Sequence, residues 1–280
     1  MASVCIIGSK LTTHYVDYSA RDYYYCMWTA CDKTRIRLFT IYEHMQTFRR
    51  TRMINDNNRA FRFLMLSILG TIIALAGDII IGYAAPGPVG TYGMVQVGWA
   101  DVALWRPTLS MIMASIAFPL YMPGIYVVAK RIEETIPWAG KAFLVTGFAA
   151  ITGGLMIHAS FCIPQYIYKY VCDAGYPDLA VKLTDRILEI AVPSALFASL
   201  AMLVGFVILF VVILQGKTIY KRWTVLFTPV IIAPATTLVA YIFSDSAFFA
   251  AFGMCKMNLG LFLFFILAAN EERKRISYPK

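Results

Sequence analysis

Long apolar stretches alternate with short polar segments along most of this chain. Six stretches carry no charge or one charge, and each is near the ~20 residues that cross about 30 Å of hydrocarbon at 1.5 Å per residue. Lipid offers no water to an unpaired backbone, so such segments must be helical. The pattern predicts an all-α membrane protein with a six-transmembrane-helix bundle. The predicted spans are Leu64–Tyr83, Pro107–Ala129, Ala142–Ile163, Ile190–Leu214, Trp223–Phe243 and Ala251–Ala269.

Composition supports this class, and the placement of the cations predicts its orientation. Hydrophobic residues make up 59% of the chain and charged residues 15%, well below the ~25% charged residues of soluble domains. Lysine and arginine gather before the first stretch, in the second and fourth connections and in the C-terminal tail. The positive-inside rule then predicts that both termini are cytoplasmic. The net charge of +9 is explained by this topology and by attraction to anionic membrane lipids, and nothing indicates nucleic-acid binding.

Residues 1–52 differ from the rest, because they contain no apolar run of spanning length. We expect a polar, disordered N-terminal extension, followed by a transmembrane domain over residues 53–280. Met53 begins a short polar lead into the first apolar stretch, so a second hypothesis is that translation starts there. Cys26 and Cys31, with His14 and His44, form an incomplete set of zinc ligands at unconvincing spacing, so no metal site is predicted.

Two predicted spans carry stripes of small residues at four-residue spacing, which places each stripe on one helix face. Such stripes let helix backbones approach closely in lipid. Each stripe also contains one ionisable residue, which must therefore point toward protein. The stripes are Gly70, Ala74, Asp78 and Gly82 in the first span, and Thr146, Ala150, Gly154, His158 and Cys162 in the third.

Three ionisable residues, Asp78, His158 and Lys256, interrupt apolar stretches at a similar predicted depth near the outer side. A charge in the bilayer costs at least ~2.5–3.5 kcal/mol, so such residues usually face the protein interior and often mark function. We expect an outward-facing polar pocket that binds or moves a small amphiphile or anionic ligand. An alternative is a structural Asp78–Lys256 ion pair with His158 as a hydrogen-bonding helper. Further candidates for the pocket are Asn258, Gln165, Glu189 and Asp245.

A membrane-embedded enzyme is a further alternative. His158 would act as general base, Asp78 would orient it, and Ser160 or Cys162 would be the nucleophile. Ser160 lies two residues from His158, so on a helix it points away, which disfavours this pair. A zinc hydrolase needs several intramembrane histidines, whereas the predicted spans hold one, and no cofactor is expected. A disulfide among Cys162, Cys172 and Cys255 is left open, as is the oligomeric state.

The chain after Met53 resembles uncharacterised bacterial six-helix integral membrane proteins. The likeness rests on Gly77 and Asp78 in the first span, and on Gly153, Gly154 and His158 in the third. The resemblance implies the same helical architecture and makes Asp78 and His158 the distinctive residues. It implies no reaction.

Overall fold

In the computed structural model, the described backbone covers residues 5–7, 10–12 and 33–277, and the described side chains lie within residues 55–277. The chain divides into two compact units, Met1–Met53 and Ile54–Lys280. The first unit contains an antiparallel pair of short strands, β1 (Cys5–Ile7) and β2 (Lys10–Thr12). The cysteine and histidine side chains that we weighed as zinc ligands lie outside the described residues. The extension, its predicted disorder and the Met53 start remain predictions.

Four long helices contain segments long and apolar enough to cross a membrane. They are α1 (Lys33–Gly82, of which Asn55–Gly82 is the candidate span), α2 (Trp105–Glu133), α3 (Pro137–Asp173) and α4 (Pro177–Leu214). A fifth candidate is the pair α6 (Ala247–Met254) and α7 (Lys256–Ser277), bent by 59° at their junction. The structure therefore supports four or five spanning segments, where the sequence predicts six.

The fifth predicted span, Trp223–Phe243, is interrupted. It forms a 3-10 helix, η2 (Arg222–Phe227), followed by a short α-helix, α5 (Pro229–Ile242). The break falls at Thr228, which is extended at φ −81° and ψ 157°. Pro229 explains the break, because proline removes a backbone donor and disfavours helical geometry in the preceding residue. At 14 residues, α5 is about 21 Å long, which is short of the hydrocarbon thickness.

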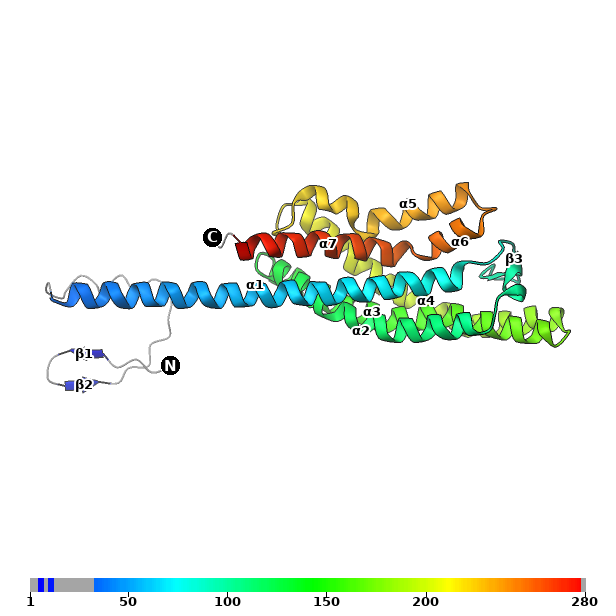
Figure 1. The fold of residues 1–280 in the computed structure, drawn as a ribbon, viewed down its shortest axis with the longest axis horizontal. Coiled ribbons are helices and arrows are strands. Elements are labelled where there is room, and N and C mark those ends of the chain that lie inside the picture. Colours follow the sequence, from blue (N-terminus) through cyan, green and yellow to red (C-terminus); the bar gives the residue numbers. More distant parts are fainter. Residues whose placement is uncertain (1–4, 8–9, 13–32, 278–280) are drawn as a thin grey trace. The chain divides into compact units, whose positions relative to one another are not determined.

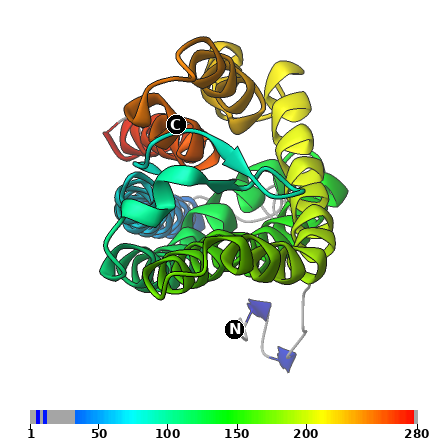
Figure 2. The same ribbon diagram turned by 90° about the vertical axis from the view of Figure 1, so that its right-hand side faces the viewer.

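In the second unit, α2, α3 and α4 run back and forth as neighbours, joined by short turns, while α5 packs on α7 (Figures 1 and 2). A hairpin of β3 (Pro88–Val89) and β4 (Val95–Gln96), followed by the 3-10 helix η1 (Val97–Asp101), closes one end. Asp185 of α4 holds this hairpin, since its carboxylate accepts hydrogen bonds from the Thr91 amide at 2.9 Å and hydroxyl at 2.8 Å. Gly90 makes the approach possible with a left-handed φ of +77°.

Large apolar side chains also lie on the outside of the helices. Ile190 and Phe197 of α4 and Tyr241 of α5 are 77–79% exposed, although the helices bury a continuous apolar core between them. Exposed apolar surface on this scale is unfavourable in water and favourable against lipid. Together with the long apolar helices, it indicates a multi-pass membrane protein.

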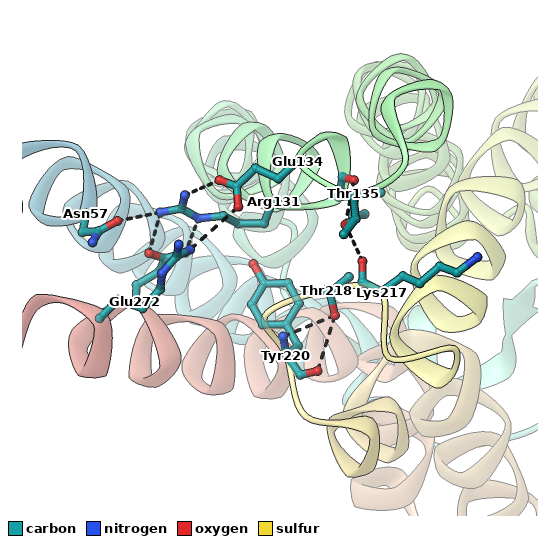
Figure 3. A network of polar contacts seen from close by, with 10 residues as sticks. Asn57, Arg131, Glu134, Thr135, Lys217, Thr218, Tyr220 and Glu272 are labelled. Atoms are coloured by element: carbon teal, nitrogen blue, oxygen red, sulfur yellow. Dashed lines mark hydrogen bonds and ion pairs between the residues drawn. The ribbon is translucent and has the colours of Figure 1, made fainter. Parts of the chain in front are cut away.

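A buried polar cluster joins three helices at the end of the second unit opposite the hairpin (Figure 3). We call Asn57, Arg131, Glu134, Glu272 and Arg275 the Arg131 cluster. Arg131 of α2 donates from Nε and Nη2 to the two oxygens of Glu272 on α7, at 2.7 and 2.8 Å. It also donates to Asn57 of α1 at 2.9 Å and to Glu134 at 2.5 Å. Glu272 is fully buried, so this bidentate pair fixes α7 against α2.

Replacing Arg131→Met is expected to lower the free energy of unfolding by about 3–5 kcal/mol, because the Glu272 carboxylate would remain buried without its cation. Thermal or denaturant unfolding of the detergent-solubilised protein measures the loss. Lys130→Met is the matched control, since Lys130 pairs with Glu133 on the surface and such pairs contribute about 0–1 kcal/mol. Equal effects of the two substitutions would contradict a structural role for the Arg131–Glu272 pair.

Candidate functional site

Asp78 lies one turn before the end of α1, inside the helix bundle, and is 5% exposed. Its Oδ2 accepts a hydrogen bond of 2.7 Å from Nδ2 of Asn258, in the first turns of α7. The amide oxygen of Asn258 in turn accepts a 2.8 Å hydrogen bond from the hydroxyl of Tyr121 on α2. This chain of contacts fixes which Asn258 atom faces the carboxylate. It also joins α1, α2 and α7, the helices that the Arg131 cluster joins at the other end.

His158 of α3 lies between Asp78 and Ser110. Its Nδ1 is 3.7 Å from Oδ1 of Asp78, and its Nε2 is 2.9 Å from the Ser110 hydroxyl on α2. Nε2 also lies 3.2 Å from the Ser110 carbonyl oxygen, and the Ser110 hydroxyl donates to the Gly77 carbonyl at 2.8 Å. The pair is packed beside Phe118, whose ring meets the imidazole edge to face.

These contacts determine where the protons lie. The Ser110 hydroxyl has one hydrogen, and donating it to the Gly77 carbonyl leaves its oxygen as an acceptor. Nε2 of His158 then faces two acceptors and must itself carry a hydrogen. Nδ1 lies 3.7 Å from Oδ1 of Asp78, which is beyond hydrogen-bond distance, so this contact does not place a proton between the two side chains. The pair has no net charge only when one of the two side chains holds one further proton.

A cavity of about 170 Å³ adjoins this polar group. Asp78, His158, Asn258 and Tyr121 line it together with Lys256, and its remaining walls are mostly apolar. Its contact with α3 runs from Phe143 to Phe161, which is about 27 Å along the helix at 1.5 Å per residue. The cavity is therefore long and narrow, with its ionisable groups at one end, while the Thr146 hydroxyl near the other end donates to the Ala142 carbonyl of its own helix. Its other walls include Phe118, Ile125, Ile151, Met202, Phe206 and Leu261.

Lys256, the first residue of α7, lines the cavity but is exposed, and it makes no ion pair with any described side chain. The structure therefore places no Asp78–Lys256 salt bridge, which was one of the expected alternatives. Asp78 is instead partnered by Asn258 and His158.

The other predicted pocket residues are not in the cavity wall. Gln165 is buried beside it and donates to the Ile81 carbonyl at 3.1 Å. Glu189 pairs with Arg186 on the exposed side of α4, and Asp245 is exposed in the turn after α5. Both acidic residues lie at the predicted outer side, but their side chains are exposed and are not part of the polar group.

The enzyme alternative needs a different nucleophile from those considered first. Ser160 donates to the Met156 carbonyl of its own helix at 2.8 Å and does not contact the His158 ring. Cys162 is buried, and it is unpaired, as are Cys172 and Cys255. The hydroxyl that contacts the His158 ring belongs to Ser110, on another helix. In the part of the chain with described side chains, no three or more His, Cys, Asp or Glu residues are grouped to hold a metal ion.

Ser110, Tyr121 and the Arg131 cluster are absent from the expectations based on sequence. Serine and tyrosine carry no charge, so they do not interrupt an apolar stretch visibly. Tyr121 did have one signal, because it lies between Pro119 and Pro123 within a predicted span. Glu272 also had a signal in the sequence, because it is an acidic residue within a basic tail.

No curated protein and no solved structure matches this chain. A family model does match over residues 53–272, which is most of the chain and includes every residue of the polar group and the cavity. The model describes a Family of unknown function, DUF6796. The chain belongs to that family.

Proposed function

We propose that this multi-pass membrane protein binds a single-chain amphiphile with an anionic head group. The observation that carries this proposal is the shape of the cavity, which is long and apolar with its ionisable groups at one end. An acyl chain fits the walls formed by aromatic and aliphatic side chains, and a head group fits beside Lys256. Ligand sites are commonly of this kind, with apolar walls and a few placed polar groups.

The charge at the polar end favours an anion. In the state in which Asp78 or His158 holds one further proton, the pair is neutral and the unpaired ammonium of Lys256 sets the sign of the charge. Lys256 begins α7, and the free backbone N–H groups of a helix N-terminus also favour negative charge. A carboxylate or a phosphate monoester on the amphiphile would interact with both.

We also propose the orientation that the cations predict. The hairpin end with the polar group would face outward, and the Arg131 cluster with both termini would face the cytoplasm of a bacterial cell. Asp185, Asp245 and Glu189 belong to the hairpin end, whereas Lys217, Lys221 and Arg222 belong to the opposite end, which supports this assignment.

Replacing Lys256→Met is expected to remove the preference for an anionic head group. Laurate, dodecanol and dodecyltrimethylammonium share one chain length and differ in charge. Their affinities for the protein in nanodiscs therefore separate the contribution of the head group from that of the chain. We expect laurate to bind the unmodified protein more tightly than the other two probes do. Laurate should bind the variant about tenfold more weakly, because one charge-assisted contact is lost, and the affinity for dodecanol should be unchanged. Lys182→Met, at an exposed lysine on α4, is the control. Equal affinity for all three probes would overturn the proposal.

Replacing Ala150→Phe is expected to shorten the ligand that fits. Ala150 lines the cavity about 12 Å along α3 from His158, so a phenyl ring there would block the far end and leave the polar end open. Affinity for a series of fatty acids should fall for long chains and persist for short ones. Ala149→Phe, on the adjacent residue outside the cavity wall, is the matched control. A uniform loss at every chain length would indicate a folding defect and not a chain site.

Acyl transfer is a second candidate function, because Ser110, His158 and Asp78 have the order of contacts found in a serine hydrolase. Two observations weigh against it. The Ser110 hydroxyl donates to the Gly77 carbonyl, not to His158, and Ser110 is fully buried and does not line the cavity. A nucleophile must reach its substrate, so we place ligand binding first.

A fluorophosphonate probe distinguishes the two functions, since it modifies only an activated serine. We expect no labelling of the native protein beyond that of the Ser110→Ala variant. Labelling that disappears in both Ser110→Ala and His158→Ala, with the variants still folded by thermal unfolding, would establish the hydrolase.

A further inference from the structure

Two buried donors beside the Arg131 cluster lack a protein acceptor among the described residues. The Tyr220 hydroxyl, in the connection between α4 and η2, makes no hydrogen bond although the residue is only 3% exposed. Nη1 of Arg275 is likewise buried and unpartnered, lying 4.0 Å from the nearer Glu134 oxygen, which is beyond hydrogen-bond distance. An unsatisfied buried donor is costly, so two that lie near one another call for a shared acceptor.

The Tyr220 hydroxyl points toward the Arg131 cluster (Figure 3). The charged groups that act on it are Glu272, Arg131, Glu134 and Arg275. Burial, followed by the nearby Glu272 carboxylate, raises the pKa of Tyr220 well above its usual range. The hydroxyl therefore keeps its hydrogen at neutral pH and remains a donor.

Arg131 has one N–H left, because four of its five N–H groups already donate to Glu272, Glu134 and Asn57. Arg275 is less engaged, because its side chain is 35% exposed and its one contact is the distant Glu134 oxygen. A ligand from the surface could therefore reach Arg275, whereas the Tyr220 hydroxyl is buried.

The surroundings of this place are basic. Exposed cations on the α4–η2 connection and on the end of α7 outnumber the nearby carboxylates, and Arg131 offsets one of the two carboxylate charges that it contacts. An oxyanion has several lone pairs, so one group can accept from both orphan donors, and its charge matches these surroundings. The exposed cations are Lys217, Lys221, Arg222, Arg273 and Lys274.

We propose that Tyr220 and Arg275 form a binding site for a phosphate oxyanion, distinct from the amphiphile cavity, which the phosphodiester of an anionic phospholipid would occupy. At the membrane end proposed to be cytoplasmic, phospholipid head groups are the most concentrated source of this chemistry. Free inorganic phosphate shares the chemistry, and the experiment separates the two sources. The site would tie α7 and the α4–η2 connection to the lipid surface.

Tyr220→Phe provides the sharpest test, because the sign of its effect depends on whether an acceptor is bound. The full chain is studied in dodecyl maltoside, a detergent without phosphate, alone, with inorganic phosphate, and with added phosphatidylglycerol. We expect the anionic lipid to raise the Tm of the native protein and to raise that of Tyr220→Phe less. In the phosphate-free detergent alone, Tyr220→Phe should equal or exceed the native Tm, since it removes an unsatisfied hydroxyl.

A second measurement does not depend on the thermal stability of the variant. Titration of a short-chain phosphatidylglycerol into the detergent-solubilised protein should show about tenfold lower affinity for Tyr220→Phe and for Arg275→Gln. The controls are Arg273→Gln, at an exposed cation two residues before Arg275, and Tyr126→Phe. If inorganic phosphate alone gives the same Tyr220-dependent increase in Tm, the site binds free anion. If Tyr220→Phe changes Tm equally in all three media, water or a protein group satisfies the hydroxyl and the proposal fails.

Discussion

Polar side chains inside this bundle must find partners within it, because lipid supplies none, and that constraint ties α1, α2 and α7 together twice. At the hairpin end, Asp78, Asn258 and Tyr121 form one continuous hydrogen-bonded chain across the three helices. At the opposite end, Asn57, Arg131 and Glu272 do the same. Both networks use one side chain from each helix. The separation and rotation of the three helices are therefore fixed at two levels. A purely apolar contact would not fix them in this way.

The other two long helices attach in a different way. Contacts between α3 and its neighbours are made by small residues, so that the backbones approach closely: a Cβ at Gly153 would lie 2.3 Å from the Cβ of Ala198 on α4. His158 provides the polar contact from α3 to the three tied helices. The cavity lies where these two modes of packing meet, between α3 and α4 on one side and α2 and α7 on the other. Small residues leave room there that larger side chains would fill.

The sequence singled out Asp78, His158 and Asn258, whereas the charged Arg131–Glu272 pair and the uncharged Ser110 and Tyr121 were missed. Asp78 and His158 stand out because each interrupts an apolar stretch on a stripe of small residues, and the structure places them 3.7 Å apart. Depth counting placed Lys256 at the same level, but it could not show that the α6–α7 bend exposes this residue. The partners Ser110, Tyr121 and Asn57 come from helices whose rotation only tertiary packing determines. Pro229 is a local signal that the fifth stretch is divided into two helices. Hydropathy averaged over the stretch conceals such a break at one residue.

The cost of the polar group argues that it does more than hold helices together. Burying Asp78 and His158 requires desolvation that their mutual contact offsets only in part, and a buried pair can often be exchanged for apolar side chains with no loss of stability. The Arg131 cluster already provides cohesion among the same three helices with a shorter, bidentate contact. The Asp78–His158 contact is longer and faces a cavity, so it contributes less to cohesion and is better placed to meet a ligand. Its position beside an unpaired lysine at the end of an apolar cavity is what ligand binding needs and what cohesion alone does not explain.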